Sequence, residues 1–316
     1  MKIKKKQYVL AVPNFSNGRD SEVIEAVVNE VRKVYGVKLV SYEPEHDFNR
    51  TVVTFIGEPQ PVKTALVNMA AKSAELIDMR NHKGTHPRIG AQDTLPIFPF
   101  KDITIEECVA LAKEIGNELH SKTQIPVFFA GEAARNDDRK AFAYIRAGQY
   151  EGLRDLLKEC KDNEDRLEEY ENRKPDLSVD GLISDSAGAT ICSAETDGLT
   201  AYNIFLGTEN LQIAKEIAKG LRGPSGGFST VRAVGIKFPE REGVVVSMNL
   251  LDCSKTPMHR AFEFVKREAE RYGVMVTGTE LVGPIKLEYI LDSFEYFFRL
   301  EGFRKEQVLE THLMDM

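Results

Sequence analysis

Two kinds of apolar pattern alternate along the chain. Short runs rich in β-branched residues predict strands, and longer stretches with an apolar residue at every third or fourth position predict helices. Ile24, Val27 and Val31 recur in this way after Ser21, which can cap a helix that Gly36 ends. The first half of the chain predicts strands at 8–13, 37–42, 51–56, around 95–98 and at 126–130, and helices at 21–36, 59–77 and 104–120.

A similar order of elements returns after residue 200, although no repeat is visible residue by residue. In both halves the order βαββαβ is typical of split βαβ, ferredoxin-like folds. We therefore predict an α/β (α+β) protein of two related ferredoxin-like subdomains, at 1–180 and 181–316, with a ligand cleft between them. The second half predicts strands at 200–206, 231–238, 244–251 and 274–279, and helices at 209–221, 257–272 and 284–299.

Charge and composition narrow the classes of function. A formal net charge of −7 argues against a nucleic-acid or anionic-membrane surface, because such surfaces need clustered Lys and Arg. No apolar run has the length of a signal peptide or a membrane span, and four scattered cysteines suggest neither disulfides nor a zinc site. The almost wholly polar stretch 158–174 predicts an exposed helix or a crossing segment between domains. We expect a cytoplasmic protein that binds small molecules in a local pocket, and a homodimer as the commonest assembly.

The segment NHKGTHPRIGAQD, residues 81–93, raises a question about its two histidines. His82 and His86 stand four residues apart, as in a helical metal pair, but Gly84 weakens a helix and Pro87 disfavours the helical conformation at His86. The alternative is a rigid loop that presents one imidazole for general acid/base chemistry, with Arg88 close behind. Two ordinary surface histidines on a turn remain a third interpretation.

Several longer segments together resemble the formiminotransferase family, in matching order and spacing from about residue 8 to residue 303. No stretch resembles the cyclodeaminase unit to which the transferase is fused in some animals. The segments are VPNFSNG (12–18), NRTVVTFIG (49–57), LIDMRNHKGTHPRIGAQD (76–93), GEAAR (131–135), IRAGQYEGL (145–153) and NLLD (249–252).

The resemblance implies an activity and a set of residues. The family transfers a formimino group from N-formiminoglutamate to N5 of tetrahydrofolate, a co-substrate, and releases glutamate without a metal. The family's catalytic histidine is the one followed by Pro-Arg, which is His86 here, and an assisting acid falls on Glu43. The candidate contacts to substrate and folate are Asn14, Asn49, Arg50, Arg88, Gly131, Arg135, Ser186, Gly188 and His259.

The sequence departs from the family pattern in one region. SVDGLISDSAG, residues 178–188, lacks the proline and aromatic residues of the family's folate-binding stretch, and residues 192–197 replace a Gly-Ala-Arg element, so that an arginine is lost and two acids are gained. Formiminoglycine or formylglutamate therefore stay open as alternative donors. A folate-binding protein without turnover is a second alternative, and a metal-dependent hydrolase that uses His82 and His86 is a third.

Overall fold

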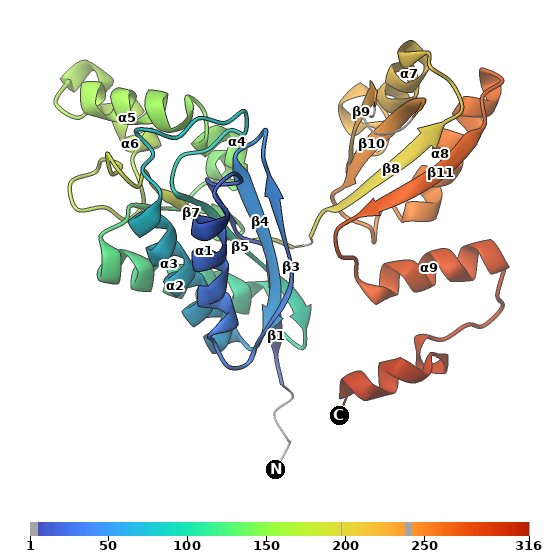
Figure 1. Cartoon of the computed structure of the whole chain (residues 1–316), viewed down its shortest axis with the longest axis horizontal. Helices are drawn as coiled ribbons and strands as arrows, with labels where there is room; N and C mark the ends of the chain where they lie inside the picture. Colours follow the sequence, from blue (N-terminus) through green and yellow to red (C-terminus); the bar gives the residue numbers. More distant parts are fainter. Residues whose placement is uncertain (1–5, 197, 238–241, 316) are drawn as a thin grey trace. The chain divides into compact units, whose positions relative to one another are not determined.

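A computed structural model describes residues 6–196, 198–237 and 242–315, and the chain divides into two compact units, 1–196 and 197–316 (Figure 1). The boundary expected at residue 180 is therefore too early. The strand at 190–194 was not predicted, and it pairs with two strands of the first unit, so the chain leaves that unit only after it. In these described parts of the chain no helix is long and apolar enough to cross a lipid bilayer.

The first unit is built on a mixed seven-stranded sheet. β4 pairs with β3 along one edge and with β1 and β2 along the other. β1 and β2 pair with β5 along their other edge, and all of these pairings are antiparallel. β7 then pairs in parallel with β5 and with β6, which extends the sheet. The strands are β1 (Tyr8–Ala11), β2 (Asn14–Phe15), β3 (Val37–Glu45), β4 (Arg50–Gly57), β5 (Gln92–Lys101), β6 (Val127–Gly131) and β7 (Thr190–Ala194).

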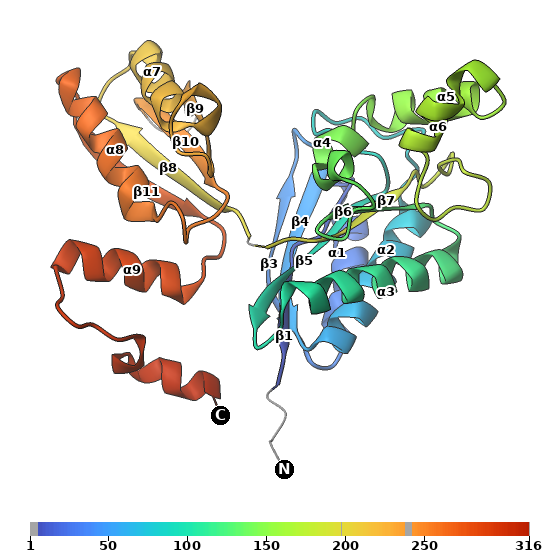
Figure 2. The same cartoon turned by 180° about the vertical axis from the view of Figure 1, so that it is seen from behind.

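Three long helices pack side by side against this sheet (Figures 1 and 2). The first buries Ile24, Val27 and Val31 as predicted, but its cap is Asp20, whose side chain accepts two backbone N–H bonds, and not Ser21. The long helices are α1 (Ser21–Arg32), α2 (Pro59–Leu76) and α3 (Ile105–Thr123). Shorter ones are η1 (Asp137–Lys140), α4 (Phe142–Ile145), α5 (Gln149–Cys160), η2 (Glu164–Arg166) and α6 (Leu167–Arg173).

The polar stretch 158–174 belongs to the first unit. It forms the end of α5, then η2 and α6, and α5 packs against α6. Most of its residues are exposed, as predicted, but it is not a connection between the units. Cys160 and Tyr170 are its buried residues. The stretch is polar because it is a helical pair on the surface of one unit, which needs apolar residues on one side only.

The second unit has a four-stranded antiparallel sheet in the order β11-β8-β10-β9. In this sheet the last strand of the unit lies beside the first, followed by the third and the second. The first unit has the same arrangement in β5, β1 with β2, β4 and β3. The predicted relation between the two βαββαβ units is therefore confirmed at the level of strand order. Phe238, the expected end of one strand, lies outside the described residues. The elements are β8 (Thr200–Leu206), α7 (Leu211–Leu221), η3 (Gly223–Ser225), β9 (Val231–Lys237), β10 (Val244–Leu250), α8 (Met258–Arg271), β11 (Val276–Val282), α9 (Leu287–Phe298), η4 (Lys305–Gln307) and η5 (Leu309–Asp315).

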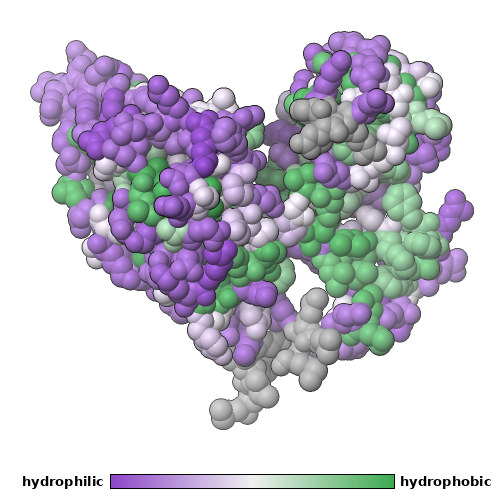
Figure 3. Space-filling model, viewed as in Figure 1, coloured by the Kyte–Doolittle hydropathy of each residue, from purple (hydrophilic) through white to green (hydrophobic). Residues whose placement is uncertain are grey.

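The last long helix leaves apolar side chains exposed. Phe294, Phe297 and Phe298 of α9 are 43%, 49% and 66% exposed, and the space-filling view shows a hydrophobic surface over this helix (Figure 3). Tyr289 and Leu291 on the same helix are buried, so α9 is held to its unit by one side only.

Candidate functional site

The two histidines lie in a loop between α2 and β5, as predicted, and the loop is not helical. The backbone of the loop is held by contacts on two sides. On one side, Asn49 donates from its side chain to the carbonyl of Lys83 at 2.9 Å, and a Cβ on Gly84 would overlap the backbone of Phe48. On the other, the N–H of Ala91 donates to the carbonyl of Ala187 at 2.8 Å. The loop therefore has a defined conformation, which a catalytic side chain requires.

Both ring nitrogens of His82 are occupied. Nε2 lies 3.0 Å from the carbonyl oxygen of Asn49, and Nδ1 lies 3.1 Å from Nε of Arg88. His82 is therefore an internal part of the loop and not a free metal ligand. No group of three His, Cys, Asp or Glu side chains suited to a metal ion occurs among the residues that the structure describes.

Arg88 is buried, and its guanidinium is taken up by protein partners. It donates two bonds to the carboxylate of Glu151, at 2.6 and 2.9 Å, and one to the side chain of Gln149 at 2.7 Å. Its backbone carbonyl accepts the N–H of Tyr150 at 2.8 Å. The arginine thus ties the histidine loop to the start of α5, and the ligand contact expected of it is not supported by this geometry.

His86 is half-buried and lies in an electropositive environment. Its ring meets that of Phe48 edge-on, with 6.2 Å between the centroids. Burial lowers the pKa of His86 to about 3, and the charges of Arg50, Arg146 and Arg88 act in the same direction. The imidazole is consequently neutral at pH 7.

Arg146 and Asp93 complete this environment, and the sequence analysis did not single out either of them. The carboxylate of Asp93 is fully buried, accepts the N–H of Ile89 at 2.7 Å and forms an ion pair with Arg146. Nε of Arg146 is buried without a hydrogen-bond partner in the described structure. Both residues stand inside the segments that carry the family resemblance, 76–93 and 145–153, and this was the available signal.

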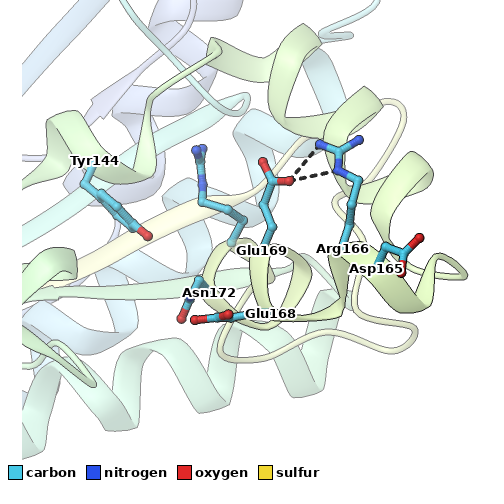
Figure 4. A pocket seen from close by; sticks show the side chains of 7 residues that line it. Tyr144, Asp165, Arg166, Glu168, Glu169 and Asn172 are labelled. Carbon is cyan, nitrogen blue, oxygen red and sulfur yellow. Dashed lines mark hydrogen bonds and ion pairs between the residues drawn. The ribbon is translucent and has the colours of Figure 1, made fainter.

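A surface depression of about 450 Å³ lies elsewhere on the first unit, between α4 and the pair η2 and α6 (Figure 4). Two of its lining residues, Arg166 and Glu169, form an ion pair at 2.8 Å. None of the predicted site residues takes part. Its lining residues are Tyr144, Asp165, Arg166, Glu168, Glu169, Asn172 and Arg173.

Comparison with known proteins identifies the family. The model of the N-terminal subdomain of the formiminotransferase domain matches residues 8–195, and that of the formiminotransferase domain matches residues 201–313. The chain belongs to the formiminotransferase family. It is 36% identical over 307 residues to glutamate formimidoyltransferase of Streptococcus pyogenes serotype M1, with 97% of this chain and 98% of that protein covered. The predicted resemblance is confirmed.

Two further relatives of this formiminotransferase-family chain differ in length. Glutamate formimidoyltransferase of Thermoplasma acidophilum is 36% identical over 307 residues, 96% of this chain and 97% of that one. Formimidoyltransferase-cyclodeaminase of Gallus gallus is 38% identical over 298 residues, which are 93% of this chain but 53% of that protein. Among solved structures, MupZ from Pseudomonas fluorescens has a TM-score of 0.23 and 15% identity over 37% of this chain and 84% of that one, too low to inform the fold.

The family-derived residues at the β3–β4 turn have structural partners. Asn49 adopts a positive φ of 50° and accepts the N–H of Gly18 through its side chain at 3.0 Å. Arg50 forms an ion pair with Glu45 at 2.5 Å. Glu43 is exposed on β3 and lies 3.5 Å from the hydroxyl of Ser41. Within the described residues, no hydrogen bond joins Glu43 to His86, so its assisting role stays a prediction.

Other family-derived residues near the strand ends are also placed. Asn14 donates to Thr94 at 2.6 Å and keeps a buried side-chain oxygen that has no partner in the described structure. Gly131 ends β6 with a positive φ of 59°. Arg135 reaches the backbone of Glu171 and lies 3.5 Å from Asp176, so its contacts are internal.

The predicted folate-binding turn packs against the histidine loop through its backbone. Ser186 is exposed, and its carbonyl accepts the N–H of Met79 at 2.7 Å. Gly188 forms an isolated bridge with Gly90. His259 belongs to the second unit, where it stacks on Tyr296 with 4.3 Å between the ring centroids. The structure thus brings Ser186 and Gly188 to the loop of His86.

The departure from the family pattern at residues 192–197 leaves an unusual carboxyl group. β7 carries Cys192 and Ser193, and Glu195 follows at its carboxyl end; Asp197 lies outside the described residues. Burial raises the pKa of Glu195 to about 7, and the nearby hydroxyl of Ser193 only partly opposes this. Oε1 of Glu195 is buried and has no donor that meets hydrogen-bond geometry in the described structure. A buried acid with a raised pKa therefore stands in the segment that departs from the family pattern.

Proposed function

We propose that the protein transfers the formimino group of N-formiminoglutamate to N5 of tetrahydrofolate, with His86 as the general acid and base. The observation that carries the proposal is the setting of His86: a half-buried, neutral imidazole on a pinned loop, with Arg50 and Arg146 beside it. Family membership supplies the class of reaction.

Electrostatics favour substrates of the proposed kind. Formiminoglutamate carries two carboxylates and folate carries those of its glutamate tail, and arginine binds carboxylates well. A bound carboxylate near Arg50 and Arg146 would offset the charges that lower the pKa of His86. The imidazolium formed during the reaction is therefore easier to form with substrate present than without it.

The chemistry requires one proton to be moved twice. N5 of the folate attacks the amidine carbon of the donor and forms a carbon–nitrogen bond. His86 takes the proton that N5 loses and returns it to the departing amine as the bond from carbon to glutamate nitrogen breaks. The products are 5-formiminotetrahydrofolate and glutamate, and no electrons are gained or lost. Positioned proton transfer of this kind contributes about 10²–10⁴ in rate.

Other parts of the proposal rest on the family resemblance. Glu43, which is exposed on β3, would support the charged imidazole. Tetrahydrofolate acts as co-substrate, and no step calls for a metal. We also propose a homodimer, the commonest assembly for a chain of this kind.

The test is turnover with defined donors. Purified protein is incubated with tetrahydrofolate and formiminoglutamate, formiminoglycine or formylglutamate, and methenyl-folate is measured after acidification, with and without a chelator. We expect turnover with formiminoglutamate that a chelator leaves unchanged. His86→Asn should lower kcat by about 10²–10⁴. Faster turnover with another donor would reassign the substrate, and folate binding without turnover on any donor would contradict the enzyme.

A further inference from the structure

His82 has one defined protonation state. Nε of an arginine is always a hydrogen-bond donor, so Nδ1 of His82, 3.1 Å from Nε of Arg88, must be the acceptor. The ring proton therefore resides on Nε2, which donates to the carbonyl of Asn49 at 3.0 Å. The ring is neutral, its tautomer is fixed, and both nitrogens are bonded.

These two bonds close the loop that presents His86. In the sequence, His86 lies between His82 and Arg88. The hydrogen bond between the side chains of His82 and Arg88 therefore encloses the segment that carries His86. Arg88 is itself held by Glu151 of α5, and Asn49 precedes β4. The imidazole of His82 thus links the β3–β4 turn, the loop and α5 at one point.

Protonation of His82 would break this link. A proton on Nδ1 would place two donors and two positive charges face to face at the 3.1 Å contact with Arg88. The charged groups around the ring of His82 are Arg88, Arg19 and Glu151. His86, four residues on, is also near enough to interact with His82 electrostatically. The β3–β4 turn contacts the ring of His82 through the backbone carbonyl of Asn49. Burial lowers the pKa of His82, with Arg88 and Arg19 acting in the same direction.

We propose that His82 is the positioning residue for His86: its neutral ring locks Arg88 to Asn49 and so holds the loop in the conformation that presents the catalytic imidazole. The inference rests on the proposed role of His86. It gives His82 a function that neither a metal pair nor an incidental loop residue would have. It also predicts that acid inactivates the enzyme through protonation of His82, because a proton on Nδ1 would break the contact with Arg88.

Two variants separate this role from plain structural support. In His82→Gln, the amide carries an acceptor and a donor but does not titrate. We expect it to keep most of the wild-type kcat at pH 8 and to shift the acid limb of the pH profile to lower pH. His82→Leu has neither group and should lose about 100-fold in kcat at pH 8, since small misplacements of a catalytic group cost this much. The matched control is His46→Gln, at an exposed histidine of the adjacent turn, which should leave the profile unchanged.

A profile of His82→Gln that overlays the wild type would overturn the proposal, as would an equal loss in the glutamine and leucine variants. A second measurement does not depend on turnover. In ¹⁵N-histidine-labelled protein at pH 8, the ring signal that disappears in His82→Gln should be that of an Nε2–H tautomer. An Nδ1–H tautomer would overturn the proposal even if the enzyme is active. Absence of turnover on every donor, with the Nε2–H tautomer observed, would instead count against the proposed function.

Discussion

Replacing Glu195 by glutamine should stabilise the protein at neutral pH but hardly at pH 5. Glutamine keeps the size of the side chain and removes the ionisation that burial opposes. Oε1 of Glu195 is buried without a donor in the described structure, so the ionised form gains little in the folded state. The unfolded chain, in contrast, ionises this group freely.

The magnitude follows from the two pKa values. The carboxyl group has an ordinary pKa of 4.5, and burial raises it to about 7 in the folded protein. Below pH 4.5 both states hold the proton, and this group has no effect. Between 4.5 and 7 only the unfolded state releases it, so wild-type stability falls with rising pH, and above 7 the loss is complete. At about 1.4 kcal/mol per pKa unit, the loss is about 3 kcal/mol.

Urea denaturation between pH 5 and pH 8.5 checks this, followed by far-UV circular dichroism because the chain has no tryptophan. The difference in free energy of unfolding between Glu195→Gln and wild type should grow by about 2.5 kcal/mol over this range. Glu164→Gln, at an exposed glutamate, is the control and should show a constant difference. A constant difference for Glu195→Gln would refute the argument that its carboxyl group is buried and unpaired.

Further predictions concern the surroundings of His86. Arg146→Met removes the partner of the buried Asp93 carboxylate and should lower the free energy of unfolding in urea by about 3 kcal/mol. The same change at Arg166, a surface ion-pair residue, should lower it by less than about 1 kcal/mol. Equal losses would contradict the argument from burial. Gly90→Ala would place a Cβ against the carbonyl of Ala189, so we expect a loss of about 1–3 kcal/mol, whereas Gly152→Ala, in open space on α5, should be neutral or stabilising. Glu43→Gln should lower kcat far less than His86→Asn, because no hydrogen bond joins Glu43 to His86 within the described residues; an equal loss would show that the carboxylate acts directly.

Some expectations failed for physical reasons. The boundary at 180 was wrong because β7 is a short strand with every residue buried, and its five residues of mixed polarity carry no periodicity that marks which sheet they join. The family resemblance implied that Arg88 contacts a ligand. In the fold its donors are used by Glu151 and Gln149, which are more than sixty positions away in the sequence. Long-range pairing of this kind leaves no local pattern.

The sequence by itself determined the two βαββαβ units, the non-helical histidine loop and the family, because periodicity, Gly and Pro act locally and the motif segments keep their order and spacing. Only the tertiary structure decided the surroundings of the two histidines. It paired His82 with Asn49 and Arg88, placed Arg50 and Arg146 beside His86, and buried Asp93 beneath Arg146. Charge, burial and hydrogen-bond partners depend on which distant residues meet, and that is fixed only when the chain is folded.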